Sequence, residues 1–156
     1  AHDTSPSDTT NLSNEGTLSL SAANIGTTRR LMMETPDMNG DLLNVMPDEL
    51  LVPPELEDAA LEAVRSTLDP ASANNAINPQ AGRFSVTVWH YLTDSNAWFM
   101  MDSGRRRQDL RWYDRIGLEI RGPIQDPDTF ISKWIAYARF SLGWVDWRFV
   151  FGQNPS

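Results

Sequence analysis

The side chains best placed to do chemistry together lie near the end of the chain, in the stretch GWVDWRFVFGQNPS. An acid and a base, Asp146 and Arg148, stand two positions apart among four aromatic residues. In a strand, side chains two apart share a face and lie about 6.6 Å from each other. Such a pair can form ion pairs across a strand or a subunit boundary and so fix orientation. We therefore predict that Asp146 and Arg148 share the contact face of a final strand over 144–151, and we name both as candidate interface residues.

The basic cluster of the sequence is Arg105, Arg106 and Arg107, and Arg111 follows four positions after its last member. As a nucleic-acid patch it is short and has no adjacent Lys, although the aromatic pair after Arg111 could stack on bases. Arginine is also enriched at protein interfaces, where its planar guanidinium pairs with carboxylates. We interpret the stretch DSGRRRQD as a polar connection that is either a solvated loop or one side of a subunit interface, with all four arginines as candidates.

Signals for enzyme chemistry are weak. The two histidines are His2 and His90, and no Gly-x-Ser-x-Gly elbow accompanies them. We interpret His90 as a histidine at a strand end, partly buried or hydrogen-bonded. The chain has no Cys, which excludes disulfides, thiolate nucleophiles and Cys-based metal sites. The stretch DMNGD begins like a calcium loop, but Leu42 replaces the turn glycine and Asp48 replaces the bidentate Glu, so we expect a plain turn. We predict no catalytic, metal-binding or cofactor-binding residue, and no cofactor.

Composition indicates an ordinary globular chain. Its 156 residues are 40% hydrophobic, the net charge is −8, and no apolar run is long enough to span a membrane. The N-terminus does not have the pattern of a signal peptide. Residues 1–82 carry 13 acids and 3 bases, whereas 83–156 carry 8 acids and 10 bases. An acidic total disfavours a protein whose main task is to grip nucleic acid, because phosphate neutralisation supplies most of that affinity.

Hydrophobic periodicity predicts an α+β fold, with helices packed on a mainly antiparallel, aromatic-rich sheet. Residues 1–16 look like a mobile tail, or an arm that orders only against a neighbour. We expect helices over 19–33 and, opened by Pro54, over 54–68. We expect strands over 50–52, 84–88, 97–101, 112–121 and 144–151. The segment TFISKWIAYARFSL fits a helix or a strand equally well, and Gly143 would mark a bulge before the last strand.

Several stretches taken together resemble the C-terminal part of tailed-bacteriophage major capsid proteins. They are LLNVMPDELLVPPELEDAALEAV, NPQAGRFSVTVWHYLTDSNAWFMM and GWVDWRFVFGQNPS. The likeness is to prophage-encoded and Mu-type major head subunits. It implies a Hong Kong ninety-seven type capsid fold, with 1–16 as a flexible tail, 17–104 as an axial lobe and 105–156 as strands returning to the peripheral lobe. It also implies that TFISKWIAYARFSL is a strand. The family's N-terminal arm, extended loop and spine helix have no counterpart here, so we expect exposed apolar faces.

The resemblance implies a structural subunit that is not an enzyme. Copies of the chain would self-assemble into pentamers and hexamers enclosing double-stranded DNA. Expected partners are other copies of the chain and other capsid or scaffold proteins. DNA would be held only weakly and without sequence specificity, and no membrane is expected. The location would be the virion capsid, assembled in the bacterial cytoplasm. The alternative is a carbohydrate- or ligand-binding module that uses aromatic residues. It predicts several exposed tryptophans in a line, whereas the capsid interpretation predicts that most are buried.

Overall fold

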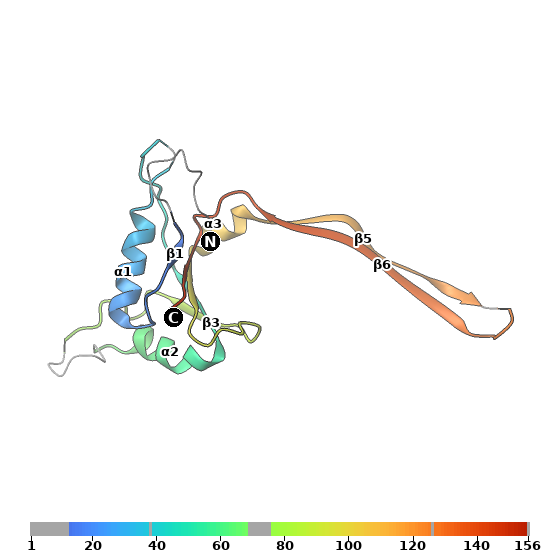
Figure 1. Ribbon diagram of the computed structural model, residues 1–156, viewed down its shortest axis with the longest axis horizontal. Helices are drawn as coiled ribbons and strands as arrows, with labels where there is room; N and C mark the ends of the chain where they lie inside the picture. Colours follow the sequence, from blue (N-terminus) through green and yellow to red (C-terminus); the bar gives the residue numbers. More distant parts are fainter. Residues whose placement is uncertain (1–12, 38, 69–75, 126, 156) are drawn as a thin grey trace. The chain divides into compact units, whose positions relative to one another are not determined.

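The computed structural model describes residues 13–37, 39–68, 76–125 and 127–155 (Figure 1). The chain divides into two units. The first, called the sheet unit below, runs to Asp109 and resumes at Asp146. The second, called the hairpin, is Leu110–Val145. Helices and strands occur together, so the predicted α+β class is confirmed.

The sheet unit is built on a five-stranded sheet of order β1-β7-β4-β2-β3. Its strands are β1 Glu15–Gly16, β2 Glu49–Val52, β3 Ser85–Val88, β4 Trp98–Met101 and β7 Val150–Gln153. The pairs β2–β4 and β4–β7 are antiparallel, whereas β1–β7 and β2–β3 are parallel. The sheet is therefore mixed, and our expectation of a mainly antiparallel sheet missed both parallel pairs. The helix between β2 and β3 explains one of them, because parallel neighbours need a crossover of this kind.

Helix α1, Ala22–Met33, confirms the first predicted helix. The Ser21 hydroxyl accepts a hydrogen bond from the Asn24 backbone N–H at 3.2 Å, which satisfies one of the free donors of the first turn. Ile25 and Met32, two helical turns apart, then fall on the buried face. They join the core formed by one face of the sheet, to which Leu50, Val52, Trp98, Met100 and Phe151 contribute.

The second predicted helix is also present, although it is shorter than expected. It opens with a 3₁₀ turn, η1 Pro54–Leu56, and continues as α2 Glu57–Arg65. Ala60, Ala63 and Val64 are buried, so α2 packs into the same core as α1. The helix stops at Arg65 because the buried Asn78 amide donates to the carbonyl oxygens of Ala63 and Ser66, at 2.8 and 2.9 Å. We predicted a helix to residue 68, so the predicted end lies three residues, about one turn, beyond the observed end at Arg65.

The first described residues are tied to the last ones. β1 pairs with β7, so the prediction of a mobile tail over 1–16 is wrong at Glu15 and Gly16; residues 1–12 lie outside the described part of the chain. Gln153, 1% exposed, accepts a hydrogen bond from the Leu18 N–H at 2.8 Å and donates to the Thr28 hydroxyl at 2.8 Å. A Cβ on Gly16 would overlap the Gln153 carboxamide, so this close approach requires glycine.

The hairpin consists of β5 Leu110–Gln125 and β6 Ser132–Trp144, which run side by side and antiparallel (Figure 1). The strand form of TFISKWIAYARFSL is thereby confirmed. β5 continues through Gly122 and Pro123, beyond the end at residue 121 that we expected, and register shifts at three places absorb its extra residues. Almost every hairpin residue is exposed, so the hairpin contributes to surface and not to the core.

Candidate subunit-contact surfaces

The arginine cluster lies on a helix and not in the loop that we predicted. Helix α3, Ser103–Asp109, is started by the buried Asp102. One carboxylate oxygen of Asp102 accepts from the Arg105 N–H at 2.9 Å, and the other accepts from the Met46 N–H at 2.8 Å. Asp at this position is a strong helix N-cap. This signal was present in the sequence and we overlooked it, because the polar composition suggested a connection.

Two of the three consecutive arginines make contacts within the sheet unit. The Arg106 guanidinium lies 3.0 Å from a carboxylate oxygen of Glu49, whose side chain is 10% exposed. The Thr87 hydroxyl donates to the other carboxylate oxygen at 3.0 Å. A carboxylate this buried needs such partners, because an unpaired buried charge is costly. Arg105 donates to the backbone carbonyl of Asn44 at 3.4 Å. Arg106 thus supports the fold, and Arg107 is the exposed member of the three.

Arg111 belongs to β5 of the hairpin, so the structure does not gather the four arginines into one patch. Whether any of them meets another subunit remains a prediction. The same holds for Asp146 and Arg148, but their predicted geometry is wrong. Residues 145–149 form a turn and only Val150–Gln153 is a strand.

In that turn Asp146 and Arg148 pair with each other. A carboxylate oxygen of Asp146 lies 3.2 Å from the Arg148 guanidinium and accepts the Arg148 backbone N–H at 3.1 Å. The guanidinium also lies over the Trp147 ring, 5.2 Å from its centroid, in a cation–π contact. The Arg148 side chain is only 11% exposed. The pair therefore stabilises the turn before β7, and its members do not sit 6.6 Å apart on one strand face.

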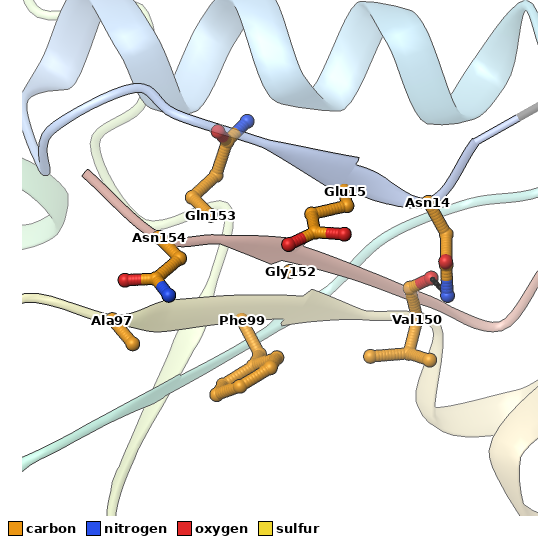
Figure 2. A pocket seen from close by; sticks show the side chains of 8 residues that line it. All are labelled: Asn14, Glu15, Ala97, Phe99, Val150, Gly152, Gln153 and Asn154. Atoms are coloured by element: carbon orange, nitrogen blue, oxygen red, sulfur yellow. Dashed lines mark hydrogen bonds between the residues drawn. The ribbon is translucent and has the colours of Figure 1, made fainter. Parts of the chain in front are cut away.

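A shallow hollow of about 280 Å³ lies over the edge of the sheet where β1, β7 and β4 meet. Figure 2 shows Glu15, Gly152 and Phe99 side by side across these three strands, as their pairing requires. Gly152 carries no side chain, and a Cβ there would come within 3.1 Å of the Phe99 ring. Of the described residues that line the hollow, Glu15 is the ionisable one, so the lining does not supply an acid–base pair.

One face of the hairpin is apolar. Directly paired residues and alternate residues along a strand share a face, so the register assigns each side chain to a side. The apolar face holds Leu110, Trp112, Ile120, Trp134, Ala136, Ala138, Phe140, Leu142 and Trp144, and Asp114, which pairs with Phe140, is its charged residue. The rings of Trp112 and Phe140 stack with centroids 4.4 Å apart, and the Trp112 N–H donates to Asp114 at 2.6 Å. Apolar side chains at every second position from 134 to 144 would have identified β6 from the sequence alone.

The expectation that most tryptophans are buried is wrong. Trp98 is fully buried and donates its N–H to the Leu18 carbonyl at 2.9 Å. Trp89 and the three tryptophans of the apolar face are exposed, by 48% to 69%. The reason is that a two-stranded hairpin has no interior, so a large side chain on either face stays accessible. His90 is likewise exposed, in the turn after β3, and is not the partly buried residue that we expected.

The family comparison decides between the interpretations. A family model described as "Phage capsid protein" matches residues 1–152. The chain belongs to the phage capsid protein family. No curated protein matches the chain. As a phage capsid protein it is a structural component of the virion shell, which agrees with the resemblance seen in the sequence.

Three further findings on the described residues of this capsid protein concern metal binding, the stretch DMNGD and membrane-spanning helices. Within 13–37, 39–68, 76–125 and 127–155, no group of three or more His, Cys, Asp or Glu side chains could hold a metal ion. In DMNGD, the Asp37 carboxylate accepts the backbone N–H groups of Asn39 and Asp41, at 2.7 and 3.0 Å, which makes the stretch a turn. In the same part of the chain, no helix is both long and apolar enough to cross a membrane.

Proposed function

We propose that the chain is the C-terminal part of a Hong Kong ninety-seven type major capsid subunit, of the prophage or Mu-type group. Its copies assemble into pentamers and hexamers that tile a shell around double-stranded DNA. The observation that carries this proposal is the family match over residues 1–152. In this assignment 17–104 belongs to the axial lobe, and 105–156 returns to the peripheral lobe. Assembly takes place in the bacterial cytoplasm, with other capsid or scaffold proteins as further partners.

The apolar face of the hairpin supports a role in assembly. Soluble proteins rarely expose a continuous apolar patch of large side chains unless that patch meets a partner. Here Trp112, Phe140, Leu142 and Trp144 are all more than half exposed and follow one another along one face. Burying such side chains contributes about 1.5–3 kcal/mol each. Contacts between neighbouring subunits would remove this face from water, and the rings of a shell need contacts of this kind to close.

Among the candidate interface residues, exposure favours Arg107 and Arg111 for contacts between subunits. Both guanidinium groups are accessible and can form paired hydrogen bonds with carboxylates. Arg105, Arg106, Asp146 and Arg148 already have partners within the sheet unit. They contribute to assembly by holding α3 and the last turn in place.

The line of exposed tryptophans is the feature that we expected of a carbohydrate-binding module. Sugar sites combine an aromatic platform with polar groups that bind the hydroxyls. On the apolar face, however, the tryptophans are interleaved with Leu110, Ala136, Ala138 and Leu142, and Asp114 already accepts the Trp112 N–H. This composition is typical of a protein–protein contact. The exposed tryptophans are thus the observation that agrees with the carbohydrate-binding alternative, whereas the family match over residues 1–152 supports the capsid proposal.

The proposal is tested by measuring the mass of the purified chain with sedimentation velocity over a wide concentration range, with electron microscopy of the largest species. We expect concentration-dependent oligomers, including closed rings. Leu142→Ser on the apolar face should weaken self-association. Ile77→Ser, at a position of the sheet unit that is 83% exposed against 61% for Leu142, should leave self-association unchanged. A chain that stays monomeric at the highest attainable concentration, or an equal effect of the two variants, would count against the proposal.

A further inference from the structure

The face of the hairpin opposite the apolar one is basic. The register places Tyr113, Ile116, Ile124, Ile135 and Tyr137 on this face. Its charged residues are Arg111, Arg121, Lys133, Arg139 and Glu119. Five such side chains give a net charge of +3 in a chain whose total is −8. All five are exposed. A basic surface on an acidic protein is expected to meet an anionic partner, since electrostatic complementarity selects partners and orients them.

The cations are spread along the length of this face. Lys133 and Arg139 lie on β6, and Arg111 faces Gly143 on the same strand. The three positions span ten residues, or about 33 Å at about 3.3 Å per residue. Arg121 is partly neutralised by Glu119, 3.1 Å away. Lys133, Arg139 and Arg111 form no ion pair with any residue that the structure describes, so their charges are available.

The sheet unit carries a shorter acidic surface on its second helix. From Glu55 to Glu62 it covers about 11 Å at about 1.5 Å per residue, so it meets one part of the basic face at a time. Glu55, Asp58 and Glu62 follow one another at spacings of three and four, which places them on one line along η1 and α2. All three are exposed, and none forms an ion pair with another described residue. Like charges at this spacing repel each other, so a cationic partner would relieve the repulsion. The buried face of α2 carries only apolar side chains, so the acidic line is its outward face.

We propose that the basic face of the hairpin of one copy docks on the acidic outer face of η1 and α2 of a second copy. This contact deepens the proposed function, on which it rests, by naming the two surfaces that meet. The surfaces differ, so the contact is head-to-tail, and identical copies joined in this way form a ring when the rotation closes. Duplex DNA fits the basic face less well, because the sheet unit of the same chain is strongly acidic and would repel the phosphates.

The contact is tested by exchanging charges between the two surfaces. Lys133→Glu with Arg139→Glu makes the hairpin face acidic, and Asp58→Lys with Glu62→Lys makes the helix face basic. Each pair alone should weaken self-association about tenfold, because each exposed ion pair changes the association constant by a factor of about 1.4 to 5 and reversal turns attraction into repulsion. An equimolar mixture of the two variants should recover association, because each variant offers a surface that complements the other. Circular dichroism should show that both variants keep the folded sheet unit.

A control for the hairpin variant makes the same change in net charge elsewhere in the chain. Arg30→Glu with Arg83→Glu alters two exposed arginines of the sheet unit and should have little effect. If wild type does not self-associate, the proposed function itself fails. If wild type associates but the charge variants behave like the control, the inference is overturned. Association could also recover only when the hairpin and helix substitutions are combined in one chain. The two surfaces would then meet within a single copy, and the inference would be overturned. So would a hairpin variant that loses binding to a short DNA duplex while its self-association is unchanged.

Discussion

Removing the Gln153 carboxamide should destabilise the sheet unit, and its two hydrogen bonds set the size of the loss. In Gln153→Leu the shape is nearly kept, but the Leu18 N–H and the Thr28 hydroxyl lose their partners. An unsatisfied buried polar group costs about 1–3 kcal/mol. Leu18 is half-buried, so water partly replaces its bond, whereas Thr28 is fully buried. We expect a loss of about 2–4 kcal/mol in the free energy of unfolding, measured by urea denaturation followed by circular dichroism.

A double-mutant cycle tests the physical reason. Thr28→Val alone should cost about 1–2 kcal/mol, because it leaves the Gln153 amide N–H without an acceptor. When Gln153→Leu and Thr28→Val are combined, the donor and the acceptor of this hydrogen bond are both removed, so neither leaves the other unpaired. The double variant should therefore be about 1 kcal/mol more stable than the sum of the single effects predicts. If the effects add to within about 0.5 kcal/mol, the two side chains are not coupled and the reasoning is refuted.

Three further outcomes follow from the structure. Asp102→Ala should lower the free energy of unfolding by about 2–3 kcal/mol in a urea titration, because it removes the α3 cap and strands the Met46 N–H. Gly152→Val should lower the free energy of unfolding by about 1–3 kcal/mol, since the new side chain meets the Phe99 ring. In a Phe99→Ala background, where that ring is absent, the same titration should show that Gly152→Val costs less. Acrylamide should quench the hairpin tryptophans of dilute protein, with protection appearing as oligomers form; unchanged quenching in the oligomer would place the contact elsewhere.

The elements that local signals control were predictable. Apolar residues at helical spacing over 19–33 predicted α1, although the predicted helix started three residues early, and Pro54 predicted the start of η1 and α2. The strands β2, β3 and β4 were predicted from apolar runs and alternation. What failed depends on contacts between distant residues. β1 has two residues and exists because β7 pairs with it, and no property of Glu15 and Gly16 alone indicates this.

The candidate contact residues show the same limit. The sequence drew attention to Arg105–Arg107 as a charge cluster, but Arg106 is engaged by Glu49, which lies far away in the chain. The alternation in β6 was readable, whereas the assignment of Arg111 and Arg139 to one face needed the register and its shifts. Asp146 and Arg148 satisfy each other inside a turn, so their two-residue spacing misled the strand prediction.

The pairing of β1 with β7 also determines the order in which the protein can fold during synthesis. It joins Glu15 to Gly152 and Gly16 to Gln153, at opposite ends of the chain, and the Asn14 side chain beside β1 donates to the Val150 carbonyl 136 positions away. The hairpin, built from neighbours in the sequence, can form as soon as it leaves the ribosome, because local contacts form fastest. The sheet must wait for β7, which is translated after the hairpin. A nascent chain therefore presents its apolar hairpin face before its own sheet closes, and nascent chains on one polysome are then exposed to premature contact with each other.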